Sequence, residues 1–341
     1  MNSPSDVNPP PDHPPIPDPR VGVLLINLGT PDEASPPAVR RYLRQFLSDR
    51  RVVEISPLVW QPILRGIILR TRPKKSAHAY SQVWTEGGSP LAAITAAQAA
   101  ALKGRFGPFV TVDYAMRYGN PAIGDRIRAL KEAGCTRILL APLYPQYCAA
   151  TTATANDEAF RALAAMRWQP AIRTLPPYHD DGRYIAALAE SVEQQIAALD
   201  FVPDAVIASF HGMPERTLQL GDPYHCHCRK TARLLSEALG RELVVAFQSR
   251  FGRAKWLEPA TDKVLAELPA KGAKKVVILA PGFSADCLET LEELAIRGRD
   301  QFLAGGGERF AYLACLNDSP GGIKMLRSIV GTELEGWVSR S

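Results

Sequence analysis

A histidine stands at the end of one of the apolar segments of this chain. His211 follows the run DAVIASF and precedes Gly212 and Pro214, so its ring is expected to project from a strand end into a crevice. A neutral imidazole accepts protons readily near pH 7, which predicts a catalytic base. A structural histidine that hydrogen-bonds to a loop is an equal alternative on position alone.

Three carboxylates stand close together near the C-terminal end. Asp286, Glu289 and Glu293 occupy positions i, i+3 and i+7 after an apolar run, and an α-helix would place them on one face. Carboxylates beside a cleft can bind a divalent cation and relay protons. The alternative is that Asp286 caps the helix with Glu289 as its capping-box partner.

Cysteine and histidine alternate at His225-Cys226-His227-Cys228. This spacing is tighter than in structural zinc sites and no second cluster completes four ligands, so we favour a surface segment at a helix start over a metal site. The six cysteines of the chain are too few and too scattered for a disulfide framework, which indicates a reducing compartment.

Residues 49–75 combine aliphatic side chains and Trp60 with flanking basic residues. The segment is too short and too often broken by proline to span a bilayer, but it could dip into a membrane interface. An ordinary helix packed on its own domain explains the composition equally well.

Short apolar runs alternate with stretches of helical periodicity along the chain. The runs 21–29, 137–145, 204–212, 242–249 and 274–283 predict buried parallel strands, and the stretches 94–106, 123–134, 180–200 and 231–240 predict helices. We therefore expect an α/β fold with two Rossmann-like domains of parallel sheets flanked by helices. The predicted parts are a proline-rich disordered tail at 1–20, a first domain at 21–168 joined by a C-terminal helix at 320–341, and a second domain at 169–319.

Several classes of function lose support from the composition. The net charge of +5 is spread along 341 residues, without the dense basic stripe that nucleic acid requires. The first strand and turn, LLINLGTPD, lacks the glycines of a dinucleotide fingerprint, and no P-loop is present. With no signal peptide and no membrane span, the expected location is cytoplasmic, with peripheral contact at the inner membrane face.

Blocks along nearly the whole chain resemble the ferrochelatase family. SFHGMPER (209–216) is similar to the family signature around its active-site histidine, and other blocks follow in the family's order: GVLLINLGTPD (22–32), GGSPL (87–91), YPQY (144–147), GDPY (221–224), FQSRFGRAKWLEPATD (247–262) and PGFSADCLETLEEL (281–294).

The resemblance implies a lyase that inserts Fe²⁺ into protoporphyrin IX in a cleft between two chelatase-like domains, the last step of haem biosynthesis. It implies that His211 and Glu289 are the catalytic residues. It also implies that these two, together with Asp286 and Glu293, bind the metal. The family positions that contact substrate fall on Tyr144, Arg117, Trp256, Ser89 and Leu28.

The resemblance also bears on cofactors and on rival functions. Cys148 lies beside the position where cluster-containing relatives place a cysteine, and their cysteine-rich C-terminal extension is missing. We therefore expect no [2Fe–2S] cluster and no other cofactor, with Fe²⁺ as substrate. The alternatives are a coproporphyrin III ferrochelatase, a chelatase for another tetrapyrrole, and a tetrapyrrole carrier without catalysis.

Overall fold

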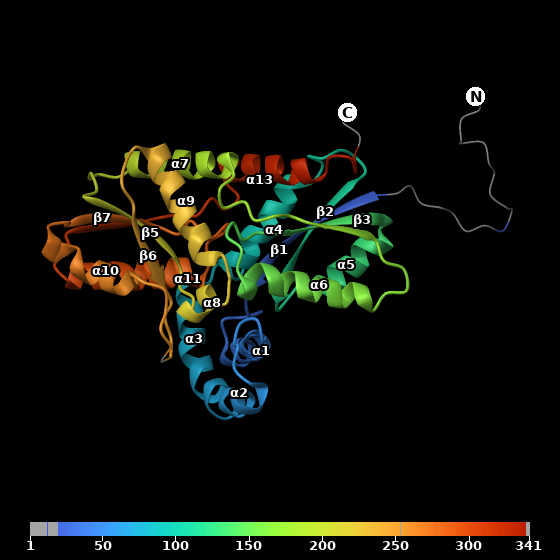
Figure 1. Cartoon of the computed structure of the whole chain (residues 1–341), viewed down its shortest axis with the longest axis horizontal. Coiled ribbons are helices and arrows are strands. Elements are labelled where there is room, and N and C mark those ends of the chain that lie inside the picture. The colour runs from blue at the N-terminus through green and yellow to red at the C-terminus, as the bar shows by residue number, and fades with distance from the viewer. Residues whose placement is uncertain (1–11, 13–19, 253, 339–341) are drawn as a thin grey trace.

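The computed structural model describes Asp12, residues 20–252 and residues 254–338. The predicted tail at 1–20 therefore lies outside the described residues, except for Asp12 and for Arg20, which begins the first strand. Two parallel sheets lie side by side, and helices cover both faces of each (Figure 1). This arrangement confirms the predicted α/β fold class, with parallel sheets flanked by helices.

The two sheets have four strands each. The first has the order β2-β1-β3-β4 and consists of β1 (Arg20–Gly29), β2 (Val110–Tyr118), β3 (Cys135–Pro142) and β4 (Ala171–Thr174). The second has the order β6-β5-β7-β8 and consists of β5 (Ala205–His211), β6 (Val244–Gln248), β7 (Lys275–Leu279) and β8 (Arg309–Leu313). All strand pairs are parallel. Central strands such as β1 are buried almost throughout because helices cover both of their faces.

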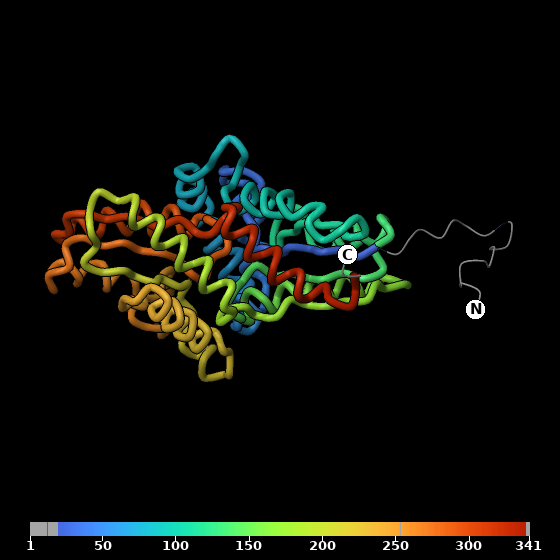
Figure 2. The backbone as a smooth tube through the Cα atoms, turned by 90° about the horizontal axis from the view of Figure 1, so that it is seen from above, coloured from blue at the N-terminus to red at the C-terminus, as the bar shows by residue number. Residues whose placement is uncertain are grey.

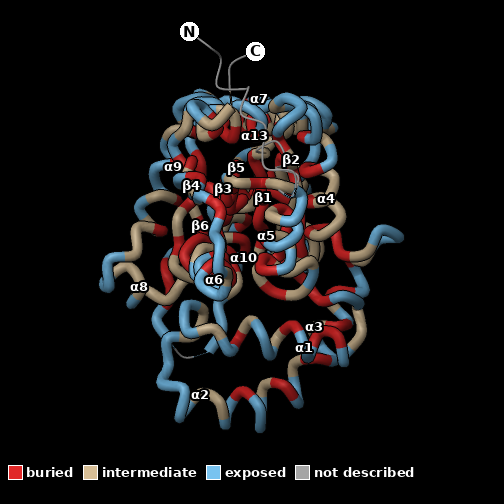
Figure 3. Tube along the Cα trace, turned by 90° about the vertical axis from the view of Figure 1, so that its right-hand side faces the viewer, coloured by how far each residue is buried: buried red, intermediate tan, exposed pale blue. Residues whose placement is uncertain are grey.

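The helices connect these strands. In the first half they are α1 (Pro36–Leu47), α2 (Pro57–Ile63), the π-helix η2 (Leu64–Ile68), α3 (Leu69–Val83), α4 (Pro90–Leu102), α5 (Ile123–Glu132), the π-helix η3 (Ala149–Ala153) and α6 (Thr154–Ala164). In the second half they are α7 (Gly182–Ala197), α8 (Glu215–Gln219), α9 (Tyr224–Leu239), α10 (Thr261–Glu267), the 3-10 helix η4 (Pro269–Lys271), α11 (Leu288–Thr290), the π-helix η5 (Leu291–Gly298), α12 (Arg299–Ala304) and α13 (Pro320–Glu333). The buried residues gather on the sheets between the helical layers (Figure 3).

The segment 49–75 forms most of a helical projection on one side of the first half. From Pro57 to Val83 the chain runs through α2, η2 and α3, which extend away from the sheets (Figure 1). One face packs inward through Leu64 and Leu69, and the Trp60 indole donates to the Leu47 carbonyl at 2.6 Å. We call α2 and η2 the lip.

The first sheet reaches beyond the domain boundary expected at 168–169. Strand β4 pairs with β3, so the first sheet extends to Thr174, because Pro170 and the prolines after Thr174 flank a short edge strand instead of a linker. Helix α13 then crosses back from the second half toward the first (Figure 2). Arg173 on β4 donates to the carbonyls of Glu333 and Glu335, which fastens the end of the chain to the first sheet.

Candidate active site

The central strand of the second sheet delivers His211 to the edge where the parallel strands end. Strand β7 pairs with β5, and the chain that leaves β7 at this same edge leads into α11 and η5, which carry Glu289 and Glu293. Two adjacent strands therefore bring an imidazole and two carboxylates to one region. The His211 ring is half-buried, and its Nδ1 lies 2.8 Å from the Gly212 carbonyl oxygen.

Glu293 links the two sides of this region electrostatically. Burial raises the pKa of the Glu293 carboxyl, and the charge of Glu289 adds to that rise, while the Ser249 hydrogen bond and the charges of Arg297 and His211 oppose it. Ser249 donates its hydroxyl proton to the Glu293 carboxylate, and Arg297 lies 3.3 Å from it. A carboxyl with a raised pKa exchanges protons more readily near neutral pH.

Glu289 is free of the capping role that its spacing allows. The helix is capped by Cys287 and Thr290, whose side chains and backbone amides form a reciprocal capping box. The Glu289 carboxylate instead acts on two buried tyrosines of the first half, Tyr42 on α1 and Tyr80 on α3. Burial raises the pKa of both hydroxyls, and the charge of Glu289 raises it further. Glu289 therefore faces the junction between the two halves.

Asp286 does not lie on the acidic helix face expected from its spacing, because the helix starts only at Leu288. Its carboxylate accepts hydrogen bonds from Tyr312 at 2.5 Å, from Thr290 at 2.9 Å and from the Asn317 amide at 2.6 Å. The backbone carbonyl of Asn317 in turn accepts a hydrogen bond from the side-chain amide of Gln98 in the first half. Asp286 thus holds the start of α11 in place, and its oxygens are occupied by neighbours.

The segment after Thr290 is π-helical from Leu291 to Gly298. Such segments are rare and frequent at functional sites. Residues four apart lie near one face of the segment, so Glu289, Glu293 and Arg297 follow one another along it. The expected series of three carboxylates is therefore a pair of carboxylates followed by an arginine.

Arg117 and Tyr144, both expected to contact substrate, lie largely buried in the first half. Arg117 donates to Asp49 at 2.5 Å and to Thr154 at 2.7 Å. Burial alone raises the pKa of Asp49, but hydrogen bonds from Thr154, the Arg51 amide and Tyr118, with the charge of Arg117, hold it below its ordinary value. The Tyr144 hydroxyl is buried and has no hydrogen-bond partner.

The other three expected substrate residues are placed differently. Trp256 is buried, donates to the Phe251 carbonyl at 3.0 Å and lies over Gly212. Ser89 is the buried N-cap of α4, although its side chain makes no capping hydrogen bond. Leu28 is half-buried and packs at the end of β1. Trp256 therefore adjoins the histidine region directly, and Ser89 serves the start of a helix.

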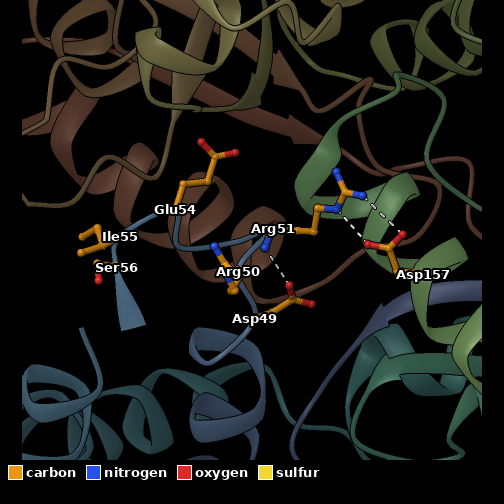
Figure 4. Close-up of a pocket in the computed structure, with 7 residues that line it drawn as sticks. All are labelled: Asp49, Arg50, Arg51, Glu54, Ile55, Ser56 and Asp157. Atoms are coloured by element: carbon orange, nitrogen blue, oxygen red, sulfur yellow. Dashed lines mark hydrogen bonds and ion pairs between the residues drawn. The ribbon is translucent and has the colours of Figure 1, made fainter. Parts of the chain in front are cut away.

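A polar cavity of about 480 Å³ lies at the base of the lip (Figure 4). Its walls include Arg50, Arg51 and Glu54, and the Arg51 guanidinium donates to Asp157 at 2.8 Å. Both partners of that pair are about half exposed, so the pair is easily rearranged. Sequence reasoning missed these arginines as site residues, although they begin the 49–75 segment.

The cluster at 225–228 lies in the first turn of α9, as the non-metal interpretation expected. Cys226 is exposed and Cys228 is buried. The His227 ring stacks on His179 with centroids 3.6 Å apart, and its Nδ1 accepts from the Tyr147 amide. Throughout the described ranges, no three His, Cys, Asp or Glu side chains are grouped so that they could hold a metal ion.

Gln248 is a second kind of site residue that the sequence reasoning did not predict. This last residue of β6 lies opposite His211 in the sheet, and its side-chain amide donates to the Glu289 carbonyl at 2.8 Å. A signal existed, because polar Gln-Ser follows the apolar run ELVVAF at the edge where His211 also stands.

Comparison with known proteins gives concordant results. The family profile described as Ferrochelatase matches residues 20–334. The ferrochelatase of Rhizobium meliloti (strain 1021) is 54% identical over 334 residues, with 96% of this chain and 98% of the relative covered. That of Rhodopseudomonas palustris (strain ATCC BAA-98 / CGA009) is 50% identical over 326 residues, with 94% of each covered.

A solved structure shares the fold at low identity. SirB from Bacillus subtilis with Fe3+ superposes with a TM-score of 0.54 at 14% identity, over 91% of this chain and 94% of that one. The structure shows a common architecture, and the sequence relatives confirm the family that the motifs indicated. The chain belongs to the ferrochelatase family, lyases that insert Fe²⁺ into a porphyrin.

Proposed function

We propose that this chain makes haem by inserting Fe²⁺ into protoporphyrin IX, with His211 as the base that takes the pyrrole protons and Glu289 with Glu293 as the acids on the other side. The observation that carries the proposal is the convergence of β5 and the α11–η5 segment at one edge of the second sheet. Asp286 is left out of the metal set because its oxygens are engaged by Tyr312, Thr290 and Asn317.

The reaction itself demands both kinds of group. A free-base porphyrin loses two N–H protons as Fe²⁺ enters, so a proton acceptor is needed beside the macrocycle. Fe²⁺ must also exchange water for other ligands on its way, and carboxylate oxygens can replace that water and let the ion go. Glu293, with its raised pKa and its contact to Ser249, suits the passage of protons between Glu289 and the surface.

The carboxylates of the substrate require positive charge near the bound porphyrin. Arg50 and Arg51 line the cavity at the base of the lip, and the exposed Arg51–Asp157 pair can open to receive a carboxylate. Protoporphyrin IX carries fewer carboxylates than coproporphyrin III and is more apolar, which suits a site beside an apolar lip. A higher kcat/KM for protoporphyrin IX would support this choice, and a preference for coproporphyrin III would reverse it.

The proposal includes no resident cofactor and no [2Fe–2S] cluster. Of the six cysteines, Cys226 and Cys228 stand on α9, while Cys287 and Cys315 lie beside α11. Burial is the main cause that raises the pKa of the Cys148, Cys228, Cys287 and Cys315 thiols. Iron analysis of the protein purified anaerobically, together with its visible spectrum, tests this.

The roles of His211 and Glu289 are tested by substitution. His211→Ala should lower turnover of protoporphyrin and Fe²⁺ by a factor of about 10² to 10⁴, the usual contribution of a positioned base. Glu289→Gln should also lower kcat while the protein still binds porphyrin, which distinguishes an enzyme from a carrier. Asp113→Asn, a carboxylate on β2, is the matched control and should leave turnover unchanged. Full activity in His211→Ala would defeat the assignment.

We further propose that the lip rests on a membrane surface and receives the apolar substrate there. Leu58 is 89% exposed, and Val59 and Ile67 are each more than half exposed. The basic side chains that accompany them and suit anionic headgroups are Arg65, Arg70, Lys74 and Lys75. Within the described part of the chain, no helix is long and apolar enough to cross a membrane. Peripheral contact from the cytoplasmic side stays our prediction.

Liposome co-sedimentation tests the lip. Leu58→Asp with Val59→Asp should release the protein from vesicles that contain anionic lipid, because both residues lose apolar contact and add like charge. Val202, which is 82% exposed before β5, supplies the control Val202→Asp, which should bind as the parent does. Equal binding of all three proteins would remove the membrane proposal without touching the chemistry.

A further inference from the structure

Gln248 is hydrogen-bonded to both sides of the proposed reactive pair. Its backbone carbonyl accepts from the Gly212 amide at 2.7 Å, directly after His211. Its side-chain amide donates to the Glu289 carbonyl at 2.8 Å. One residue therefore connects the end of β5 to the start of the α11–η5 segment.

The Gln248 side chain is held in a single orientation by its neighbours. Ser209, two residues before His211, donates to the side-chain oxygen Oε1 of Gln248 at 2.8 Å, and the Ser209 hydroxyl also lies 2.8 Å from that of Thr261. All three residues are buried. Because the carbonyl end is occupied by Ser209, the amide NH₂ end must point toward Glu289.

The space around Gly212 keeps this connection tight. A Cβ at position 212 would lie 2.5 Å from the Gln248 carbonyl oxygen and 3.3 Å from the Trp256 ring. Since such an approach is not tolerated, the backbones of β5 and β6 meet at this point only because residue 212 is glycine. The strand end that carries His211 is therefore fixed against Gln248.

We infer that Gln248 is a positioning residue that sets the separation between the His211 ring and the Glu289 carboxylate. This inference rests on the roles proposed above for those two residues. Displacement of catalytic groups by about 1 Å can lower a rate by about 100-fold, so a bridge between their backbones controls the rate without touching the substrate.

The experiment compares Gln248→Met with Thr261→Val. Methionine keeps the length of the side chain but makes neither amide hydrogen bond, so kcat with protoporphyrin and Fe²⁺ should fall by about 10- to 100-fold. The dissociation constant for porphyrin, measured by fluorescence quenching, should stay unchanged. Thr261→Val removes a hydroxyl from the same buried cluster without any contact to Glu289, and it should keep the parent kcat.

A second variant keeps the test decisive if the methionine variant does not fold. Gln248→Glu retains an acceptor for Ser209 but places a carboxylate oxygen against the Glu289 carbonyl, so its kcat should fall at least as far. A parent kcat in either folded Gln248 variant overturns the inference. An equal loss in Thr261→Val also overturns it, since general loosening of the cluster would then be the cause.

The same series separates this inference from the proposed function. His211→Ala is measured beside the Gln248 variants. If it keeps full turnover, the proposed roles fail whatever Gln248 does. If it loses turnover while Gln248→Met does not, only the positioning role of Gln248 fails.

Discussion

The two halves of the molecule have the same strand order, and they differ in the residues at the end of the central strand. In each sheet the first strand in sequence is central, the second pairs on one side of it and the third on the other. The first central strand ends in Leu28-Gly29, with Gly29 beside Tyr118 at the end of β2. The second ends in His211-Gly212 beside Gln248 at the end of β6.

The same architectural position thus holds the apolar side chain of Leu28 in one half and the imidazole of His211 in the other. The connection after each central strand differs as well. Between β1 and β2 the chain inserts α1, the lip, α3 and α4, whereas between β5 and β6 it inserts only α8 and α9. The first half supplies the lip and the buried Asp49–Arg117 network, and the second half supplies the titratable groups of the candidate site, His211, Glu289 and Glu293. The repeated fold therefore determines at which strand ends functional residues can lie, but it does not determine which half contains them.

The largest expected effects come from the two glycines that end the central strands. Gly29 has φ +108°, and a Cβ there would lie 1.8 Å from the Tyr118 carbonyl oxygen, so Gly29→Ala should prevent stable folding. Gly212→Ala, with its 2.5 Å approach to Gln248, should give folded protein with kcat lowered by about 10-fold or more. Circular dichroism and turnover assays measure the pair. A folded and active Gly29→Ala variant would contradict the idea that each central strand needs a glycine at its end.

The buried ion pair of the first half should give the next largest effect. Asp49 and Arg117 side chains are only 11% and 13% exposed, so Asp49→Asn leaves a buried cation unpaired and should lower the free energy of unfolding by about 3 kcal/mol. The exposed pair Asp125–Arg128 supplies the control, since Asp125→Asn should cost less than about 1 kcal/mol. Urea unfolding at pH 7 makes the comparison.

The same variant gives a prediction for pH. Because the pKa of Asp49 is lowered in the folded protein, its stabilising contribution is complete above the ordinary aspartate pKa of about 3.9 and is lost as the pH falls through the folded value. Between about pH 5 and pH 3 the parent should therefore lose more stability than Asp49→Asn. Parallel loss in both proteins would show that Asp49 is not a contributor.

The smallest expected effect belongs to Leu28, which stands where the other half has His211. Leu28→Ala removes an apolar surface that would bind substrate and transition state equally, so KM for porphyrin should rise about threefold with kcat unchanged. Steady-state kinetics distinguish the two parameters. A large fall in kcat would mean that the first half takes part in the chemistry and would weaken the contrast between the halves.

The sequence predicted the four interior strands and the edge strand β6, and it missed the other three edge strands. The continuous apolar runs of β1, β3, β5 and β7 indicate strands that are buried on both faces. Strands β2, β4 and β8 were missed because they stand at or near a sheet edge and carry polar residues such as Asp113, Arg173 and Arg309. Their partners come from distant parts of the chain, which no local pattern reveals.

The candidate site was predictable by residue type more than by geometry. His211, Glu289 and Glu293 follow apolar runs, and parallel strands must end at one edge. The hydrogen bonds that Asn317 donates to Asp286 and that Arg117 donates to Asp49 join residues far apart in the sequence, so no local pattern predicts them. Glu293 and Arg297 are four residues apart, so even an α-helix would place them on one face, whereas the π-helical winding of this segment has no periodic signature in the sequence.

Helix α13 has a consequence for how the two halves can move. The chain crosses between them twice, after β4 and again after β8, and Arg183 on α7 donates to Ser328 and Thr332 on α13. Both crossings lie on the side opposite the lip (Figure 1). We therefore expect any separation of the halves to be greatest on the side of the lip, where α3 meets the α11–η5 segment through noncovalent contacts alone.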